Sequence, residues 1–185
     1  MKRKAFLTIA GCTVKRFDNM QLRDQLPFRP QFGAFGEDAK AEYAQADYSV
    51  MDAFRMRVFL DAAENKGLSV EAAKYIAGNC ERALRGASAV GGDGDLWIFY
   101  AQGRAFQPED GGDAITGRTL GAGTLDTLAE FVAAKVDRDE TQFLALINAS
   151  LASRHVLGSA VKAGLINVAI EDVWMGDYRT TGAEG

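Results

Sequence analysis

The sequence predicts an α+β protein with two domains: an amino-terminal helix-turn-helix domain over residues 1–86 and a small α/β domain (β-α-β-α) over residues 95–178. Apolar residues recur at helical spacing through the first half. Four glycines fall between residues 86 and 94, which predicts a domain boundary there. Beyond it, strand-like and helix-like segments alternate. A chain of 185 residues with 48% hydrophobic content is long enough to bury a core.

The first two predicted helices are separated by a very short turn. One covers residues 3–10 and ends at Gly11, and the next follows Thr13, a residue type that commonly caps helices. This second helix runs to about Asp24, ahead of Pro27. Two helices joined by so short a turn are typical of a helix-turn-helix.

The second helix has a polar, basic face. We expect Val14 and Phe17 to be its buried contacts. The opposite face is formed by residues at i, i+4 and i+8 with one basic neighbour, namely Lys15, Asn19, Arg23 and Arg16.

The rest of the first domain is predicted to be a loop and two helices. Residues 27–47 contain scattered prolines and glycines and are interpreted as a loop or wing. Helical spacing resumes near Val50 and ends at Gly67. Ser69 is then positioned to cap a last helix that extends to about Leu84.

The second domain is predicted to alternate strands and helices. Residues 95–101 form an apolar strand, and residues 103–123 form a long glycine-rich connection that can contain a hairpin. Thr124 caps a helix, residues 143–147 form another strand, and residues 150–163 form the final helix.

Charge is distributed unevenly along the chain. Residues 1–35 carry seven Lys or Arg and two acids, whereas the remainder carries 14 basic and 23 acidic residues. A basic amino-terminal segment followed by an acidic remainder is typical of a nucleic-acid-binding domain attached to a partner or sensor domain, because phosphate attraction is needed only where DNA lies. A chance fluctuation is the alternative.

The sequence lacks the residues that several classes of functional site require. Cys12, Cys80 and the single His155 are too few for a disulfide framework or a zinc site. Residues 117–124 lack the ending of a phosphate-binding P-loop, and no nucleophile motif accompanies His155. No apolar run approaches the length of a membrane span. We therefore expect a cytoplasmic protein that is not an enzyme and has no metal, cofactor or membrane partner.

Three segments of the first domain share their order and spacing with a known family. They are Gly11–Phe17 (GCTVKRF) continuing to Gln25-Leu26-Pro27, Tyr48–Phe59 (YSVMDAFRMRVF) and Gly67–Ala72 (GLSVEA). These resemble the G-V-S-V-R-T-L…G-L-L-P, Y-S-E-E-D-L-A-R-L-R-F-I and G-F-S-L-E-E runs of MerR-family transcriptional regulators. The resemblance covers residues 3 to about 80.

The resemblance implies a winged helix with its recognition helix in the major groove of DNA. Arg, Lys and Asn side chains reach base edges there, while other basic side chains hold phosphates. The sequence departs from the family where Asp18-Asn19-Met20 replaces an Arg-Tyr-Tyr trio, and it lacks the family's long dimerisation helix. The expected DNA contacts are Thr13, Lys15, Arg16, Asn19, Arg23, Arg29, Arg55 and Arg57.

These observations predict a sequence-specific DNA-binding transcriptional regulator of bacterial or prophage type. We expect it to bind double-stranded DNA as a homodimer at a roughly palindromic operator. The second domain would dimerise, bind a small effector or contact a protein partner. One alternative is a protein-interaction adaptor whose winged helix does not read DNA, and another is an excisionase-like factor that bends DNA.

Overall fold

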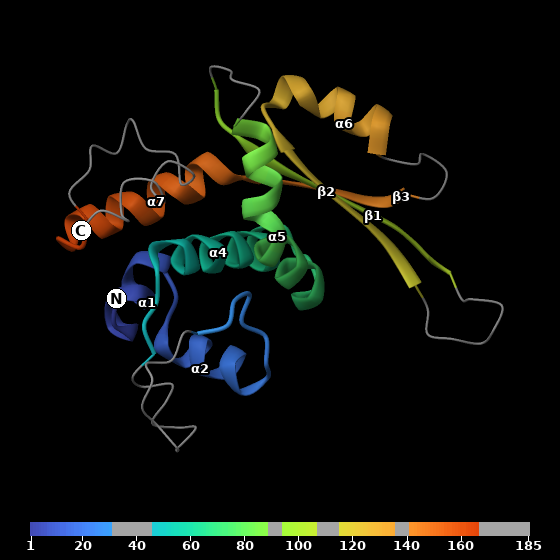
Figure 1. Ribbon diagram of the computed structural model, residues 1–185. Coiled ribbons are helices and arrows are strands. Elements are labelled where there is room, and N and C mark those ends of the chain that lie inside the picture. Colours follow the sequence, from blue (N-terminus) through green and yellow to red (C-terminus); the bar gives the residue numbers. More distant parts are fainter. Residues whose placement is uncertain (31–45, 89–93, 107–114, 136–140, 167–185) are drawn as a thin grey trace. The chain divides into compact units, whose positions relative to one another are not determined.

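The computed structural model describes residues 1–30, 46–88, 94–106, 115–135 and 141–166 (Figure 1). It combines helices with a three-stranded antiparallel sheet, so the predicted α+β class is confirmed. The chain forms two compact units, unit 1 (Met1–Gly78 with Ser150–Gly185) and unit 2 (Asn79–Ala149). This division assigns the last described helix to unit 1, whereas the sequence predicts it within the second domain.

Unit 1 contains the helices predicted from the first half of the sequence. They are α1 (Arg3–Ala10), α2 (Val14–Leu22) and α4 (Val50–Leu60), which continues into a short π-helical segment, Asp61–Asn65. Helix α5 (Val70–Ser88) begins in unit 1 and continues into unit 2. Nearly all of α7 (Ala149–Lys162) belongs to unit 1.

The turn between α1 and α2 has a defined geometry. Gly11 has a φ of 68°, in the left-handed region, and this lets the Cys12 N–H donate to Leu7 O at 3.0 Å. The side chain of Thr13 then accepts a hydrogen bond from the Arg16 N–H at 3.3 Å and caps α2. The predicted helix boundaries and cap at this turn are confirmed.

An aromatic cluster holds α1 and α2 together. Phe6 stacks on Tyr48 with ring centroids 4.4 Å apart, and it meets the edges of Phe17 at 5.7 Å and Phe28 at 5.5 Å. Phe6 and Phe17 are fully buried. The contacts are drawn from α1, α2 and the segments before and after residues 31–45, so they fix the orientation of α2 in unit 1.

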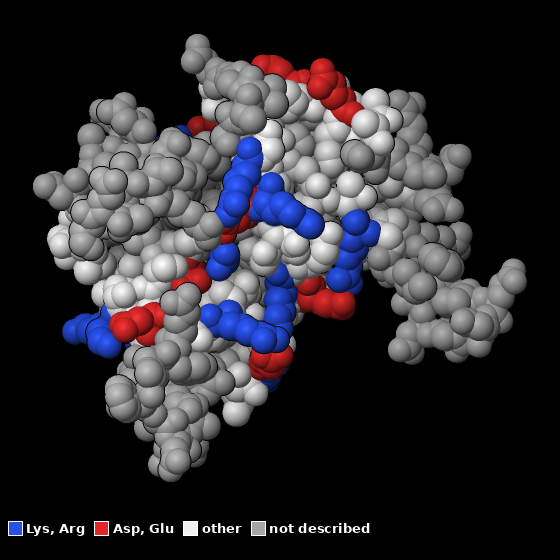
Figure 2. All heavy atoms as spheres, viewed as in Figure 1, with Lys and Arg blue, Asp and Glu red and all other residues white. Residues whose placement is uncertain are grey.

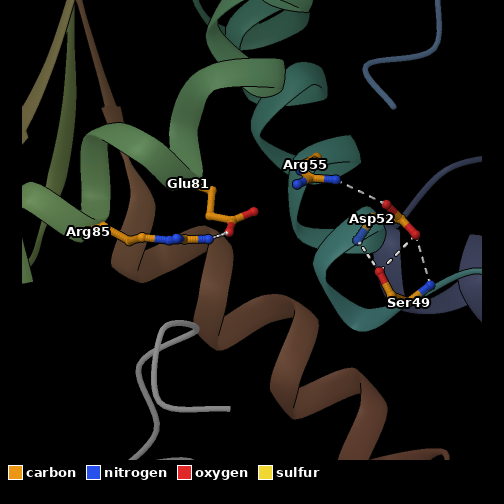
Figure 3. A network of polar contacts seen from close by, with 5 residues as sticks. All are labelled: Ser49, Asp52, Arg55, Glu81 and Arg85. Atoms are coloured by element: carbon orange, nitrogen blue, oxygen red, sulfur yellow. Dashed lines mark hydrogen bonds and ion pairs between the residues drawn. The ribbon is translucent and has the colours of Figure 1, made fainter. Parts of the chain in front are cut away.

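Helix α4 begins with a complete capping box (Figure 3). The Ser49 N–H donates to Asp52 Oδ2 at 2.9 Å, and the Asp52 N–H donates to Ser49 Oγ at 3.0 Å. Arg55 Nη1 pairs with the other oxygen of Asp52 at 3.3 Å. The same figure shows an ion pair between Glu81 and Arg85 one turn apart on α5, in unit 2.

Unit 2 is built on a sheet with the strand order β2-β1-β3. Strand β1 (Trp97–Phe106) pairs antiparallel with both β2 (Ile115–Gly123) and β3 (Thr141–Asn148). The strands predicted at residues 95–101 and 143–147 are confirmed. Within residues 103–123, which the sequence predicts to be a connection that can contain a hairpin, the end of β1 pairs antiparallel with residues 115–123, which form β2. The predicted β-α-β-α order is wrong in omitting this strand.

Glycines in β2 allow a helix to approach the sheet closely. Helix α6 (Leu128–Lys135) follows a short 3-10 turn and packs on β2 (Figure 1). A Cβ at Gly121 would lie 2.6 Å from the Phe131 ring, and that ring lies 5.3 Å from Phe99 on β1. Gly121 therefore makes room for the aromatic contact that joins α6 to the sheet.

Some predicted features lie outside the described residues. These are most of the wing, at residues 31–45, most of the glycine-rich boundary, at residues 89–93, the possible hairpin tip, at residues 107–114, and the end of the second domain, at residues 167–178.

Candidate nucleic-acid interface

Helix α2 turns one face toward the core of unit 1 and another toward solvent. Phe17 and Met20 are buried, while the exposed positions follow one another at alternating intervals of one and three residues: Val14, Lys15, Asp18, Asn19, Leu22 and Arg23. The prediction that Val14 is buried is wrong, because its side chain is 59% exposed. Met20, at i+3 from Phe17, takes the second core position instead.

The polar face predicted from the sequence is exposed. Lys15 and Asn19 lie one turn apart on α2, and Arg23 follows as the residue that ends the helix. In the described part of the chain, no ion pair or side-chain hydrogen bond engages any of these three side chains. They are therefore available to an external partner that offers negative charge or hydrogen-bond acceptors.

Three of the other arginines predicted to touch DNA are engaged within unit 1. Arg16 forms an ion pair with Glu64. Arg57 makes a two-pronged contact with Asp61, through Nη2 at 2.5 Å and Nε at 3.3 Å. With Arg55 held by the acid of the capping box, three of the predicted cations have acidic neighbours.

Thr13 and Arg29 have separate local settings. The side chain of Thr13 accepts the hydrogen bond from the Arg16 N–H and is otherwise exposed at the start of α2. Arg29 is exposed directly after Phe28, which belongs to the aromatic cluster. Among the described residues, Arg29 has no ion pair.

Arg3 is a functional candidate that the sequence analysis did not single out. It forms an ion pair with Asp18, and its guanidinium carbon lies 5.1 Å from the centre of the Phe17 ring. The pair partly neutralises the one carboxylate on the exposed face of α2. The charge count of the first 35 residues includes Arg3, but only the folded arrangement of α1 against α2 brings it to Asp18.

Basic and acidic side chains lie next to each other over α1 and α2 (Figure 2). Lys2 Nζ lies 3.2 Å from an oxygen of Asp47, and Lys74 Nζ lies 3.6 Å from an oxygen of Asp24. Acidic side chains therefore interrupt the basic surface of unit 1. On the exposed face of α2, Lys15 and Arg23 have no such partner among the described residues.

The end of α2 is fixed by a second left-handed residue. Asp24 has a φ of 51°, and the Gln25 N–H donates back to Met20 O at 2.8 Å. Lys74 on α5 donates to Asp24 O at 2.5 Å. Both ends of the candidate interface helix are thus held by hydrogen bonds within unit 1.

His155 on α7 lies close to the turn between α1 and α2. A Cβ at Gly11 would be 3.1 Å from His155 Nε2 and 3.2 Å from Arg57 Nη1. Partial desolvation lowers the pKa of His155, and the positive charge of Arg57 acts in the same direction, while Asp61 opposes both. The neutral imidazole is therefore the form that this environment favours.

Cys12 is buried in the turn between α1 and α2. Burial raises the pKa of the Cys12 thiol, and the nearby Arg16 only partly opposes this effect. Over residues 1–30, 46–88, 94–106, 115–135 and 141–166, no three His, Cys, Asp or Glu side chains gather in a metal-binding arrangement. Within those same ranges, no helix combines the length and the hydropathy of a membrane span.

No family model matches the chain, and no curated protein matches it.

Proposed function

We propose that this protein is a sequence-specific DNA-binding transcriptional regulator in which α2 enters the major groove. The observation that carries the proposal is the exposed, unengaged row formed by Lys15, Asn19 and Arg23 on a helix held at both ends. A helix that exposes such side chains fits the width of the major groove of B-form DNA. The resemblance of residues 3–80 to MerR-family regulators supports the same assignment and adds the expectation of a wing.

Some of these side chains would position α2 on the duplex, and others would read the base sequence. Lys15 and Arg23 lie toward opposite ends of α2, where cationic groups contact phosphates and set the register of the helix on the duplex. Asn19 lies between them and is suited to the paired donor and acceptor of adenine. Thr13 and Arg29 complete the expected contacts, whereas Arg16, Arg55 and Arg57 must leave or share their acidic partners to reach DNA.

We further propose that the protein acts as a homodimer, so that two copies of α2 meet two half-sites about one helical turn apart. Unit 2 would supply the dimer contact or bind an effector or protein partner. Selection from random duplexes tests this directly, because a dimer enriches a two-fold symmetric sequence.

The test compares the unaltered protein with Lys15→Ala/Arg23→Ala and with Lys162→Ala, an exposed lysine of α7 that serves as control. Binding to the enriched duplex should weaken steeply between about 50 and 200 mM salt. The double variant should bind more weakly, with its salt slope reduced by about 1 for each lost phosphate contact, and the control should retain the original slope. Absence of binding at low salt would exclude the proposal.

A protein-interaction adaptor is the second candidate, favoured by the ion pairs of Arg16, Arg55 and Arg57. Cations already paired within the fold contribute less to phosphate attraction. This candidate predicts that the random duplexes are not retained at any salt concentration and that Lys162→Ala and Lys15→Ala/Arg23→Ala behave alike.

A further inference from the structure

Two large aliphatic side chains are exposed on the same face of α2 as the candidate DNA contacts. Leu22 is 86% exposed and Val14 is 59% exposed. They are eight residues apart and therefore lie on the same side of the helix. Leu22 follows Asn19 at i+3, which makes these two residues direct neighbours on the helix surface. Single exposed aliphatic residues are ordinary, but here a pair shares one face with the candidate base reader.

The major groove offers one apolar group that such side chains can contact. This is the C5 methyl group of thymine, which projects beside the acceptor and donor of the paired adenine. One A·T pair therefore presents a partner for an amide side chain next to a partner for an aliphatic one. The adjacent Asn19 and Leu22 match that combination.

The one acid on this face is engaged within unit 1, which disfavours a contact with cytosine. A free carboxylate on a recognition helix accepts from the N4 amino group of cytosine. Asp18 is the acid on this face, and its ion pair with Arg3 competes with any contact between Asp18 and cytosine. Lys15 and Arg23, which could also contact guanine, are assigned above to phosphates. The other side chains on the face, Val14, Asn19 and Leu22, do not prefer a G·C pair.

We infer that α2 reads A·T pairs in the major groove, with Asn19 bound to adenine and with Leu22 and Val14 packed on thymine methyl groups. This inference rests on the proposed DNA-binding function and specifies the sequence class of the operator. It requires no movement of the ion pairs that hold Arg16, Arg55 and Arg57.

The test uses the duplex enriched by selection and the same duplex synthesised with uracil in place of thymine, which removes the methyl groups and keeps every Watson–Crick pair. Each lost methyl contact should weaken binding about fourfold. Leu22→Ala should bind the thymine duplex more weakly and show a smaller uracil effect. Leu151→Ala, which truncates an exposed leucine of α7, is the matched control and should behave as the unaltered protein does.

The outcomes separate this inference from the function on which it rests. Weaker binding to the uracil duplex, with the effect reduced in Leu22→Ala, supports it. Tight binding to both duplexes overturns the thymine contact but leaves DNA binding standing. Failure to retain any duplex overturns both.

Discussion

Replacing Gly11 by alanine perturbs the turn that sets α2 against α1. The φ of 68° at this residue costs an alanine roughly 1–2 kcal/mol. The new Cβ would also lie 3.1 Å from His155 Nε2 and 3.2 Å from Arg57 Nη1, and overpacking of this kind adds about 1–3 kcal/mol. The two terms sum to about 2–5 kcal/mol, and the stiffer unfolded chain of alanine offsets about 0.5 kcal/mol of this. We therefore expect Gly11→Ala to lower the free energy of unfolding by about 1.5–4.5 kcal/mol in urea denaturation.

Gly67→Ala is the matched control for this prediction. Gly67 has a φ of 65°, but nothing lies within 4 Å of a Cβ built there. It should lose only the conformational part, about 1 kcal/mol after allowance for the stiffer unfolded chain. A second change, His155→Ala, should recover part of the loss in Gly11→Ala and none in Gly67→Ala. Equal losses for the two glycines would refute the claim that α7 and Arg57 crowd the turn.

Three further predictions concern the core and titration of unit 1. Phe17→Ala should lower the free energy of unfolding by about 3–5 kcal/mol in urea denaturation, because its fully buried ring joins α2 to the aromatic cluster; a loss under 1 kcal/mol would contradict this packing. Because the pKa of His155 is lowered in the folded protein, the unfolded chain binds a proton before the folded protein does as the pH falls below about 6.5, and the free energy of unfolding should decrease. The melting temperature of His155→Gln should depend less on pH over that range. A thiol reagent at neutral pH should leave the buried Cys12 unmodified until urea unfolds the protein, whereas immediate labelling would show that it is accessible.

The helical part of the fold could be predicted closely from the sequence, because its signals are local. Gly11 and Thr13 mark the end of one helix and the start of the next by backbone geometry and capping alone. Ser49 and Asp52 likewise form a capping box within four consecutive residues. Such features need no knowledge of distant parts of the chain.

The sequence indicates that residues 103–123 can contain a hairpin, but the extent of β2 could not be predicted, because its glycines serve a contact with a residue distant in the sequence. Glycine is disfavoured in strands, yet Gly121 and Gly123 lie opposite Phe99 and Trp97 in the register of β1. Gly121 accommodates the Phe131 ring of α6, ten residues later in the sequence. Local propensity thus indicates a loop where tertiary packing stabilises a strand.

The candidate interface could be predicted only in part for the same reason. The spacing of Lys15, Asn19 and Arg23 identifies the exposed face of α2. The ion pairs that engage Arg16 and Arg57, and the pairing of Arg3 with Asp18, depend on how helices pack. The exposure of Val14 likewise depends on Met20 taking the adjacent core position.

The most direct test of the central claim is to follow the backbone amide resonances of the whole protein by NMR while the enriched duplex is added. The account predicts that the largest shifts fall on the amides of Thr13–Arg23 and their immediate neighbours, and that Lys15→Ala/Arg23→Ala diminishes them. Shifts confined to unit 2, or no shifts at all at low salt, would contradict the claim that α2 binds DNA.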